Sequence, residues 1–436
     1  MITAASVVAL ELTRLVAGFV TARLLTPSDY GLMGVAVVAT GLGLQALNFR
    51  VADSLVQLPA DPGEAYDYGF TLMVWLVPVY LAITAGAAVV TAVLYQRANL
   101  VPLCLLLAVL GIQLPAEVLR VYVQRELRWW LNRVTTTAGP MVGLVVSLVL
   151  AFRGAGYWAL AWGLVTSTLI SAALLWARAP RLPRLRRTVP RAELLRFLSF
   201  GVPLWLAGIL GSVAAYGISL ELQVALGIGF IGLYRLTISI GDRIDTAEQL
   251  VGAVLFPVIC RITDPASLKR AFELSGQLVL VWAVPAGLGL AVFAPDIVRY
   301  ALGPRWTPIV PLLVVEGVGE TLNAVGTLWQ LFYVAAGKTK PTLVMGAQIN
   351  VFLLVALGLM AMRFGYQGVV VTFFAAVMIG LIQRMRYMDR LLPGTTLFRA
   401  ALPVLAAGLI AVAGTLAVRQ VAGGAGVGNF ALRVGC

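Results

Sequence analysis

The chain has 436 residues, of which 60% are hydrophobic and 12% are charged, and its net charge is +13. Soluble domains carry about 25% charged residues because their surface faces water. This composition therefore excludes a soluble globular protein and most classes of soluble enzyme. Since a helix that crosses a bilayer needs ~20 apolar residues, a chain of this length predicts an all-α polytopic membrane protein.

The residue types exclude several kinds of site. The sequence has no histidine, and its three cysteines, Cys104, Cys260 and Cys436, are far apart. A disulfide framework or a zinc site needs more of these residues at closer spacing. We therefore expect no metal and no cofactor, and we attribute most of the positive charge to membrane topology and not to nucleic-acid binding.

Apolar runs interrupted by Pro, Gly and Arg predict the membrane spans. We read the first run as a retained span, because it lacks the charged start of a cleaved signal peptide. The stretch 421–436 predicts a shortened fourteenth span. The thirteen longer spans are expected at 2–25, 31–50, 68–95, 99–124, 134–152, 156–177, 198–222, 227–258, 271–295, 308–336, 342–362, 367–388 and 398–418.

The basic residues of the connections indicate the orientation. Twenty Lys and Arg residues follow even-numbered spans and seven follow odd-numbered spans. Since cytoplasmic loops collect Lys and Arg, the N-terminus and the basic loops are predicted to be cytoplasmic. The connection 49–67 disagrees, because it holds Asp53, Asp61, Glu64 and Asp67 against Arg50. Acidic residues count little in this rule, and the assignment is kept.

The basic connection between residues 178 and 196 divides the chain into two sets of six spans. Because six is even, both sets start on the same side, and a repeat would have its axis along the membrane normal. The segments 25–32 and 226–233 share Leu, Gly and Leu at one offset. We predict two six-helix lobes related by a pseudo-twofold axis. The predicted domains are a first lobe 1–178, a linker 179–197, a second lobe 198–390, and 391–436 with helix 13 and a shortened helix 14.

Two glycine motifs resemble nucleotide-binding sequences. The segment 227–232 reads GxGxxG, but it joins two membrane spans and follows no strand. Gly337-Lys338-Thr339 resembles the end of a phosphate-binding loop, but the first glycine of that motif is replaced by Phe332. The chain therefore encodes no ATPase, and a transporter of this sequence would use an ion gradient or the substrate gradient.

Charged residues within predicted spans are costly and commonly line a water-filled cavity. Desolvated arginines suit an anionic head group such as pyrophosphate, and carboxylates that lack a partner can exchange protons. The alternative is that these charges neutralise one another as structural pairs. The predicted substrate-binding residues are Arg14, Arg235 and Arg243. The predicted ion-coupling residues are Glu11, Asp242, Asp245, Glu316 and Glu320.

The segment 21–31, TARLLTPSDYG, resembles a signature of the polysaccharide flippases in the multidrug/oligosaccharidyl-lipid/polysaccharide exporter superfamily. Looser similarities extend it over nearly the whole chain. They are at 52–57 (ADSLVQ), 226–234 (LGIGFIGLY), 255–257 (LFP) and 302–306 (LGPRW). The family often has fourteen complete spans, whereas this sequence ends early in the last one.

The resemblance implies a non-enzymatic flippase of the bacterial inner membrane, used in lipopolysaccharide or exopolysaccharide biosynthesis. The substrate would be a glycan linked to undecaprenyl pyrophosphate. Membrane lipids, a polysaccharide polymerase and glycosyltransferases are the candidate partners, and no oligomeric state follows. One alternative is a multidrug or small-molecule exporter of the same superfamily, which would need a more acidic, aromatic cavity. A membrane polymerase or ligase would need a longer loop outside the membrane than the sequence offers.

Overall fold

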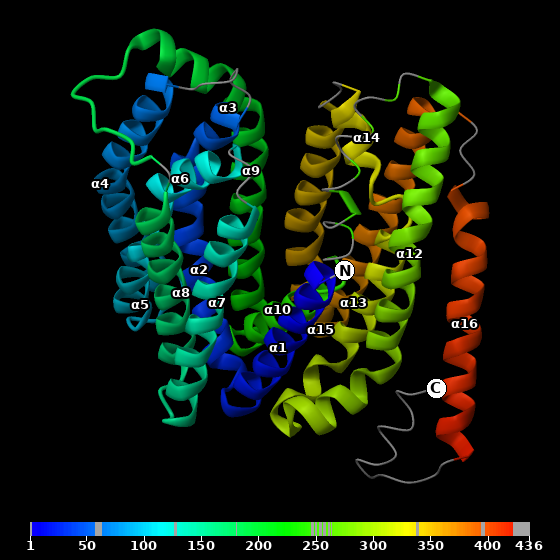
Figure 1. The fold of residues 1–436 in the computed structure, drawn as a ribbon. Helices are drawn as coiled ribbons and strands as arrows, with labels where there is room; N and C mark the ends of the chain where they lie inside the picture. The colour runs from blue at the N-terminus through cyan, green and yellow to red at the C-terminus, as the bar shows by residue number, and fades with distance from the viewer. Residues whose placement is uncertain are drawn as a thin grey trace. The chain divides into compact units, whose positions relative to one another are not determined.

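The computed structural model describes residues 2–421 except 57–62, 126–128, 180, 246–247, 249–250, 253–254, 256–258, 260–261, 263, 337–339 and 394–396. The described residues form helices joined by turns and loops (Figure 1). They divide into two compact units, Met1–Gly232 and Leu233–Cys436. The predicted division at residues 178 and 198 stays a prediction, as do the lobes that it defines.

The helices of the first unit run from the N-terminus to the start of α10, which crosses the boundary. They are α1 (Ile2–Leu24), α2 (Pro27–Asn48), α3 (Val51–Val56), α4 (Gly63–Leu94), α5 (Leu100–Leu107), η1 (Ala108–Ile112), α6 (Gln113–Arg125), α7 (Trp129–Phe152), α8 (Tyr157–Arg178), α9 (Arg191–Leu226) and α10 (Ile228–Gly241). The core of this unit lies among α2, α3, α4, α6, α8 and α9, with Tyr66, Tyr80 and Phe197 nearly fully buried.

The described helices of the second unit begin, after α10, with α12. They are α12 (Pro265–Asp296), η2 (Ile297–Leu302), η3 (Pro304–Ile309), α13 (Val310–Asn323), α14 (Trp329–Ala335), α15 (Lys340–Leu391) and α16 (Leu397–Val421). Gly365, with a φ of 56°, interrupts α15 and divides it at the position between the predicted spans 342–362 and 367–388. The predicted shortened helix 14 lies outside the described residues.

The surfaces of the helices are those of a membrane protein. Large apolar side chains are exposed along α4, α12 and α16, such as Val93, Leu278 and Ile410. In water each would lose the free energy of burial, whereas in hydrocarbon they need no cover. Among the described residues, eight helices are long and apolar enough to cross a membrane. The number is lower than thirteen partly because α15 covers two predicted spans and because α10 and α13 have 14 residues each.

The segment TARLLTPSDYG forms the start of α2. Thr26 is the N-cap, Pro27 occupies the first turn, and Asp29 completes a capping box. The Thr26 hydroxyl accepts a bond from the Asp29 N–H at 3.2 Å, and Asp29 accepts from the Thr26 N–H at 2.9 Å. The other Asp29 oxygen accepts from the N–H of Tyr157 at 3.0 Å, at the start of α8. Asp29 therefore satisfies orphan donors at two helix N-termini.

A reciprocal close contact joins the two segments that share the Leu, Gly and Leu pattern. A Cβ on Gly31 would lie 2.0 Å from the carbonyl oxygen of Ile228, and a Cβ on Gly232 would lie 1.8 Å from that of Pro27. Pro27 and Ile228 occupy equivalent places in the two segments, as do Gly31 and Gly232. Gly31 therefore contacts Ile228, and Gly232 contacts Pro27, the residue equivalent to Ile228. Two equivalent contacts in opposite directions are the pattern of a twofold contact.

We predict that Gly31→Val destabilises the protein, because the added side chain would meet backbone and not a movable side chain. Overpacking of this kind costs typically ~1–3 kcal/mol. Gly41→Val in the same helix is the matched control, since no atom lies within 4 Å of the position of its Cβ. The measurement is the thermal unfolding midpoint of each purified variant in detergent. Equal midpoints for the two variants would contradict the contact.

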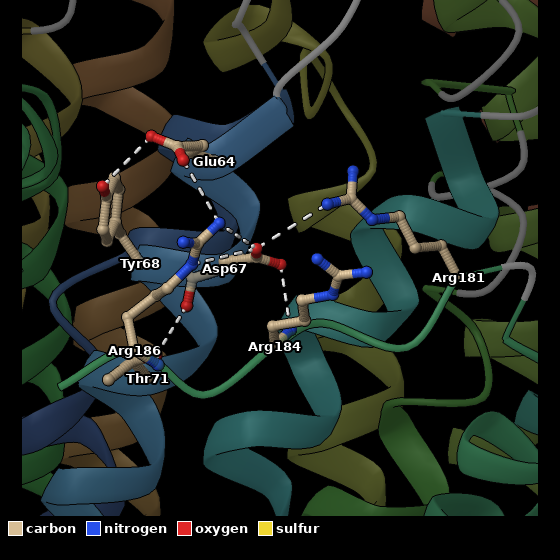
Figure 2. Close-up of polar contacts among 7 residues, drawn as sticks. All are labelled: Glu64, Asp67, Tyr68, Thr71, Arg181, Arg184 and Arg186. Atoms are coloured by element: carbon tan, nitrogen blue, oxygen red, sulfur yellow. Dashed lines mark hydrogen bonds and ion pairs between the residues drawn. The ribbon is translucent and has the colours of Figure 1, made fainter.

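The basic linker, residues 179–190, is held against α4 by an acidic pair that we call the linker clamp, Glu64 and Asp67 (Figure 2). The Asp67 side chain is fully buried and accepts from the N–H of Arg184 at 3.0 Å and from the Arg186 guanidinium at 3.1 Å. Arg181 approaches the same carboxylate at 3.6 Å. Glu64, which is exposed, pairs with Arg186 at 3.2 Å.

Two further contacts complete the linker clamp. The Thr71 hydroxyl accepts from the N–H of Arg186 at 3.0 Å, one turn along α4 from Asp67. The Arg186 guanidinium also lies 6.0 Å from the centre of the Tyr68 ring. The interaction with both carboxylates raises the pKa of Arg186, the bond to Asp67 being the largest cause. Glu64 and Asp67 belong to the acidic connection that disagreed with the charge rule, and their partners are the arginines of the most basic one.

We predict that Asp67→Ala destabilises the protein by about 1–3 kcal/mol, because the Arg184 N–H and the Arg186 guanidinium lose their buried acceptor. Glu64→Ala removes the exposed partner of the same arginine, and exposed ion pairs contribute only about 0–1 kcal/mol. Unfolding midpoints and the rate of trypsin cleavage in the linker would be measured for both variants. Equal behaviour of the two variants would show that the linker is not held through Asp67.

Candidate functional site

Two helices of the second unit end inside segments for which the sequence predicts continuous spans. α10 ends at Gly241 and is followed by turns over 242–245, whereas a span was expected over 227–258. α13 ends at Asn323 and turns lead to α14, whereas a span was expected over 308–336. Non-helical backbone at membrane depth is tolerated where it is buried in protein or lines a polar cavity. The two breaks therefore indicate where such a cavity lies.

Carboxylates from α13 face the end of α10. Glu316 packs on Gly241 so closely that a Cβ there would lie 2.2 Å from Glu316 Oε1. One turn later, Glu320 lies within hydrogen-bonding reach of Asp245 and Asn323. The Thr327 hydroxyl, in the turns after α13, donates to Glu248 in the segment after α10. The acidic side chains of the two broken helices thus meet, and this cluster is the candidate site.

Arg384 of α15 supplies positive charge to the cluster. Its side chain is 6% exposed, and its two terminal nitrogens donate to Asn323, to the carbonyl oxygen at 2.6 Å and to Oδ1 at 2.9 Å. Its Nε is buried and has no hydrogen-bond partner among the described residues. Asp245, Glu248 and Glu320 all act on it electrostatically. Arg384 is near the end of the predicted span 367–388 and was one of the twenty basic residues assigned to loops, whereas its side chain is buried in the structure.

A cavity of about 270 Å³ lies between α13 and α15. Its polar lining comes from Glu316, Glu320, Asn323 and Arg384. Its remaining described wall is apolar or glycine, and its single aromatic residue, Phe373, stacks on Tyr234 of α10 with 5.0 Å between ring centres. The cavity is thus an acidic, partly aromatic pocket that contains one buried guanidinium.

The charges around the pocket suit an exchangeable cation. The carboxyl groups of Glu320 and Asp245 are within hydrogen-bonding reach of each other. Two such groups repel each other unless a proton or a cation lies between them. Within the described residues, no group of three His, Cys, Asp or Glu side chains is arranged to hold a metal ion. The arrangement suits a shared proton or a small cation, with Arg384 as a fixed counter-charge.

The structure places the predicted ion-coupling residues as follows. Asp245, Glu316 and Glu320 come together at the pocket, and Asp242 is exposed in the turn next to α10, within electrostatic reach of Asp245 and Glu316. Glu11 lies in α1, and its side chain is outside the description. Asn323, Thr327, Glu248 and Arg384 were missed as site residues. All four lie within predicted spans, and the charges of Glu248 and Arg384 were the sequence signal that could have found them.

The predicted substrate-binding arginines lie in different parts of the fold. Arg14 is half-buried in α1 of the first unit, and Arg235 is half-buried in α10 of the second unit. Arg243, in the turn after α10, acts electrostatically on Asp242. The binding role of the three arginines stays a prediction.

A second, larger cavity of the second unit is apolar. It has a volume of about 560 Å³ and lies between α12 and α16, with walls that include Val281, Leu288, Phe293 and Ala407. Among its lining residues only Thr415 has a polar side chain. Its chemistry suits a hydrocarbon chain.

We predict that Arg384→Gln destabilises the protein, because it leaves Asp245, Glu248 and Glu320 without their counter-charge. Removal of one partner of a buried ionic group costs about 3–5 kcal/mol. Arg386→Gln is the matched control, since Arg386 lies in the same helix and is exposed. Unfolding midpoints in detergent, and the yield of monodisperse protein, would be compared. Equal midpoints for the two variants would contradict the role of Arg384 as a buried counter-charge.

Sequence comparison decides the family. The family described as "Polysaccharide biosynthesis protein" matches residues 20–311, about two thirds of the chain. The chain belongs to this family. The expected resemblance to the polysaccharide flippases is thereby confirmed, and the matched range includes both α2 with its capping box and the broken helix α10.

A curated relative agrees with the family. The chain is 25% identical over 321 residues to the lipopolysaccharide biosynthesis protein WzxC of Escherichia coli (strain K12). The match covers 70% of this chain and 63% of that protein. The matched part of this polysaccharide biosynthesis protein therefore spans less than two thirds of its relative.

Solved structures show the fold. The chain is similar to lipid II flippase MurJ in an inward closed conformation, with a TM-score of 0.71, 11% identity, and coverage of 96% of this chain and 93% of that one. An inward-facing multidrug resistance MATE family transporter of the MOP superfamily matches with a TM-score of 0.57, 15% identity, and coverage of 88% and 96%. This polysaccharide biosynthesis protein thus has the all-helical fold of those transporters, as a multi-pass membrane protein.

Proposed function

We propose that the protein is a flippase that moves a lipid-linked oligosaccharide or polysaccharide repeat unit across the bacterial inner membrane, for lipopolysaccharide or exopolysaccharide biosynthesis. The observation that carries the proposal is membership of the polysaccharide biosynthesis family over residues 20–311. The transporter fold, and the acidic pocket at the breaks of α10 and α13, support it. The protein is a transporter and not an enzyme in this proposal.

The mechanism would be alternating access by two six-helix lobes related by a pseudo-twofold axis along the membrane normal. The reciprocal contact of Gly31 and Gly232 supports this symmetry, because equivalent residues meet in both directions. Arg14, Arg235 and Arg243 would bind the pyrophosphate of the carrier, since a guanidinium can contact two phosphate oxygens at once. The glycan would follow the pyrophosphate through the membrane.

The apolar cavity between α12 and α16 offers a place for the polyprenyl tail. The tail is hydrocarbon, and its cost of leaving the bilayer is lowest where it stays in an apolar environment. The cavity is almost free of polar side chains and lies against α16, whose surface exposes Leu409 and Ile410. The head group could then move while the tail stays near lipid.

Proton exchange at the pocket would couple transport to the proton gradient. Protonation of Glu316 or Glu320 would remove negative charge from the pocket, and the buried Arg384 would then lack part of its counter-charge. The loss of one negative charge in a low-dielectric site can shift the equilibrium between two packing arrangements of the broken helices. The carboxylates are therefore proposed as the coupling groups, with Asp242, Asp245 and Glu11.

The proposal includes the surroundings of the protein. The N-terminus and the basic linker are placed in the cytoplasm, because the basic residues collect after even-numbered spans. The glycan would be carried by undecaprenyl pyrophosphate, and the partners would be the glycosyltransferases that build it and the polymerase that receives it. Membrane lipids surround the exposed apolar helices.

The acidic and partly aromatic pocket favours a second candidate, a multidrug or small-molecule exporter. Carboxylates and Phe373 suit an organic cation better than they suit pyrophosphate. The similarity in fold to a multidrug transporter agrees with this candidate. Family membership favours the flippase, since the matching family is one of polysaccharide biosynthesis and not of drug export.

The experiment that tests the proposal uses the purified protein in liposomes that contain a fluorescent undecaprenyl-pyrophosphate-linked oligosaccharide. A membrane-impermeant reductant reports the fraction of probe in the outer leaflet, and protein-dependent exchange between leaflets is expected. Exchange should fall in Arg14→Gln, Arg235→Gln and Arg243→Gln. Full activity in all three variants would remove the proposed phosphate site. No exchange by the wild type, together with uptake of ethidium under a proton gradient, would favour the exporter.

We predict that Glu320→Gln abolishes the response of transport to an imposed pH gradient, because the side chain can no longer exchange a proton. Slow exchange down the substrate gradient should remain. Asp389→Asn is the control, since Asp389 is an exposed carboxylate on α15, and it should leave the response unchanged. The initial rate in liposomes with and without a pH difference would be measured. A full response in Glu320→Gln would exclude Glu320 as the coupling group.

A further inference from the structure

The linker and the start of α9 form a basic and apolar surface on the first unit, which we call the linker surface. Segment 178–196 holds seven arginines and one glutamate. Arg184, Arg187 and Arg191 are exposed, and within the described residues their guanidinium groups make no hydrogen bond or ion pair. Between them, Leu182 and Leu185 are 58% and 64% exposed. A surface of unpaired arginines and exposed leucines is unusual for a water-facing loop.

The linker clamp holds the backbone of this surface in place. Asp67 and Thr71 bind the N–H groups of Arg184 and Arg186, and Asp67 and Glu64 neutralise the Arg186 side chain. The clamp thus forms ion pairs with Arg186 and, at 3.6 Å, with Arg181. Figure 2 shows that Arg184 contacts Asp67 through its main chain, while its guanidinium has no contact drawn. Arg196 pairs with Glu193 at 3.5 Å, whereas Arg184, Arg187 and Arg191 are not neutralised within the described residues.

The first turns of α9 extend the same surface. In Figure 1 they run across the end of the first unit before the helix turns along it. Their exposed side chains are Arg191, Ala192, Leu195 and Arg196, whereas Phe197 is fully buried. These positions lie on one face of a helix, because Ala192, Leu195 and Arg196 follow Arg191 by one, four and five residues. These first turns are therefore amphipathic, with an outer face that includes arginine and leucine.

The linker surface also lies at the edge of the apolar spans. The apolar segment of α8 ends at Arg178, and the apolar run of α9 begins at residue 198. The residues between them follow one span and precede the next, so they lie at the level of the lipid head groups. A helix that exposes basic and apolar side chains at this level is suited to lie in the interface plane.

We propose that the linker surface binds the head groups of anionic phospholipids, with Leu182, Leu185 and Leu195 inserted among the upper acyl carbons. The charges are complementary, and the leucines supply the apolar contact that a soluble phosphate could not offer. Each arginine near an anionic membrane surface contributes about fivefold to association. Because exposed charges are screened over ~8–10 Å at physiological salt, the binding should weaken as salt rises. The proposal does not depend on what the protein transports.

The experiment places a fluorophore at the centre of the surface. Leu185→Cys is labelled with an environment-sensitive dye on a background in which the three native cysteines are alanine. The protein is reconstituted in nanodiscs of phosphatidylcholine alone or with increasing phosphatidylglycerol. The emission is expected to shift to the blue as phosphatidylglycerol increases, and 0.5 M salt should reverse the shift.

The variants decide the role of the arginines. Arg187→Gln should weaken association about fivefold and so raise the phosphatidylglycerol fraction at half-shift. The triple variant Arg184→Gln, Arg187→Gln and Arg191→Gln should abolish the shift. Arg97→Gln with Arg153→Gln is the matched control, because both arginines are exposed in other connections of the same unit. Unfolding midpoints check that the variants fold. Equal emission in both lipids, or a shift that survives the triple change, would overturn the proposal.

A soluble phosphate is the competing ligand. Inorganic pyrophosphate should reverse the shift no more than sodium chloride of the same ionic strength. Reversal by micromolar pyrophosphate would assign the arginines to a soluble phosphate and would also overturn the proposal. Neither result depends on transport, so failure of the flippase function would be seen separately.

Discussion

A backbone amide or carbonyl group inside a bilayer has no water to bind, and the rest of the structure depends on this constraint. Helices satisfy it within one segment, which is why nearly every described residue of the spans is helical. Where α10 and α13 end early, the free backbone groups need other partners, and Arg384 donates to the carbonyl oxygen of Asn323. The breaks, the carboxylates and the buried arginine therefore occur together.

Much of the fold follows from the sequence because hydrocarbon acts on each span separately. The predicted spans agree with α1, α2, α4, α7, α8 and α16 to within a few residues at most ends. The signature segment was also informative: Thr26, Pro27 and Asp29 are the residues that local capping requires. The acidic connection 49–67 was an anomaly for the charge rule. The hydrogen-bond partners of its Glu64 and Asp67 are 117 to 122 residues away, and a local rule does not contain such contacts.

The candidate site was harder to predict because hydropathy does not register a broken helix. Segments 227–258 and 308–336 are apolar enough to be read as single spans, although both are interrupted. Asp245, Glu316 and Glu320 were found because charge in a span is unusual, and Arg384 was missed because it lies near the end of one. Its burial depends on α13 packing against α15, which no periodicity in either helix indicates.

The contact of Gly31 and Gly232 has a consequence for how relatives of this protein can diverge. Each glycine faces main-chain atoms, and those atoms are present whatever the side chains are. A larger residue at one position cannot be offset by a smaller one elsewhere, so compensating pairs of changes are not available here. The two positions are therefore expected to stay glycine independently, while the sequences around them drift apart.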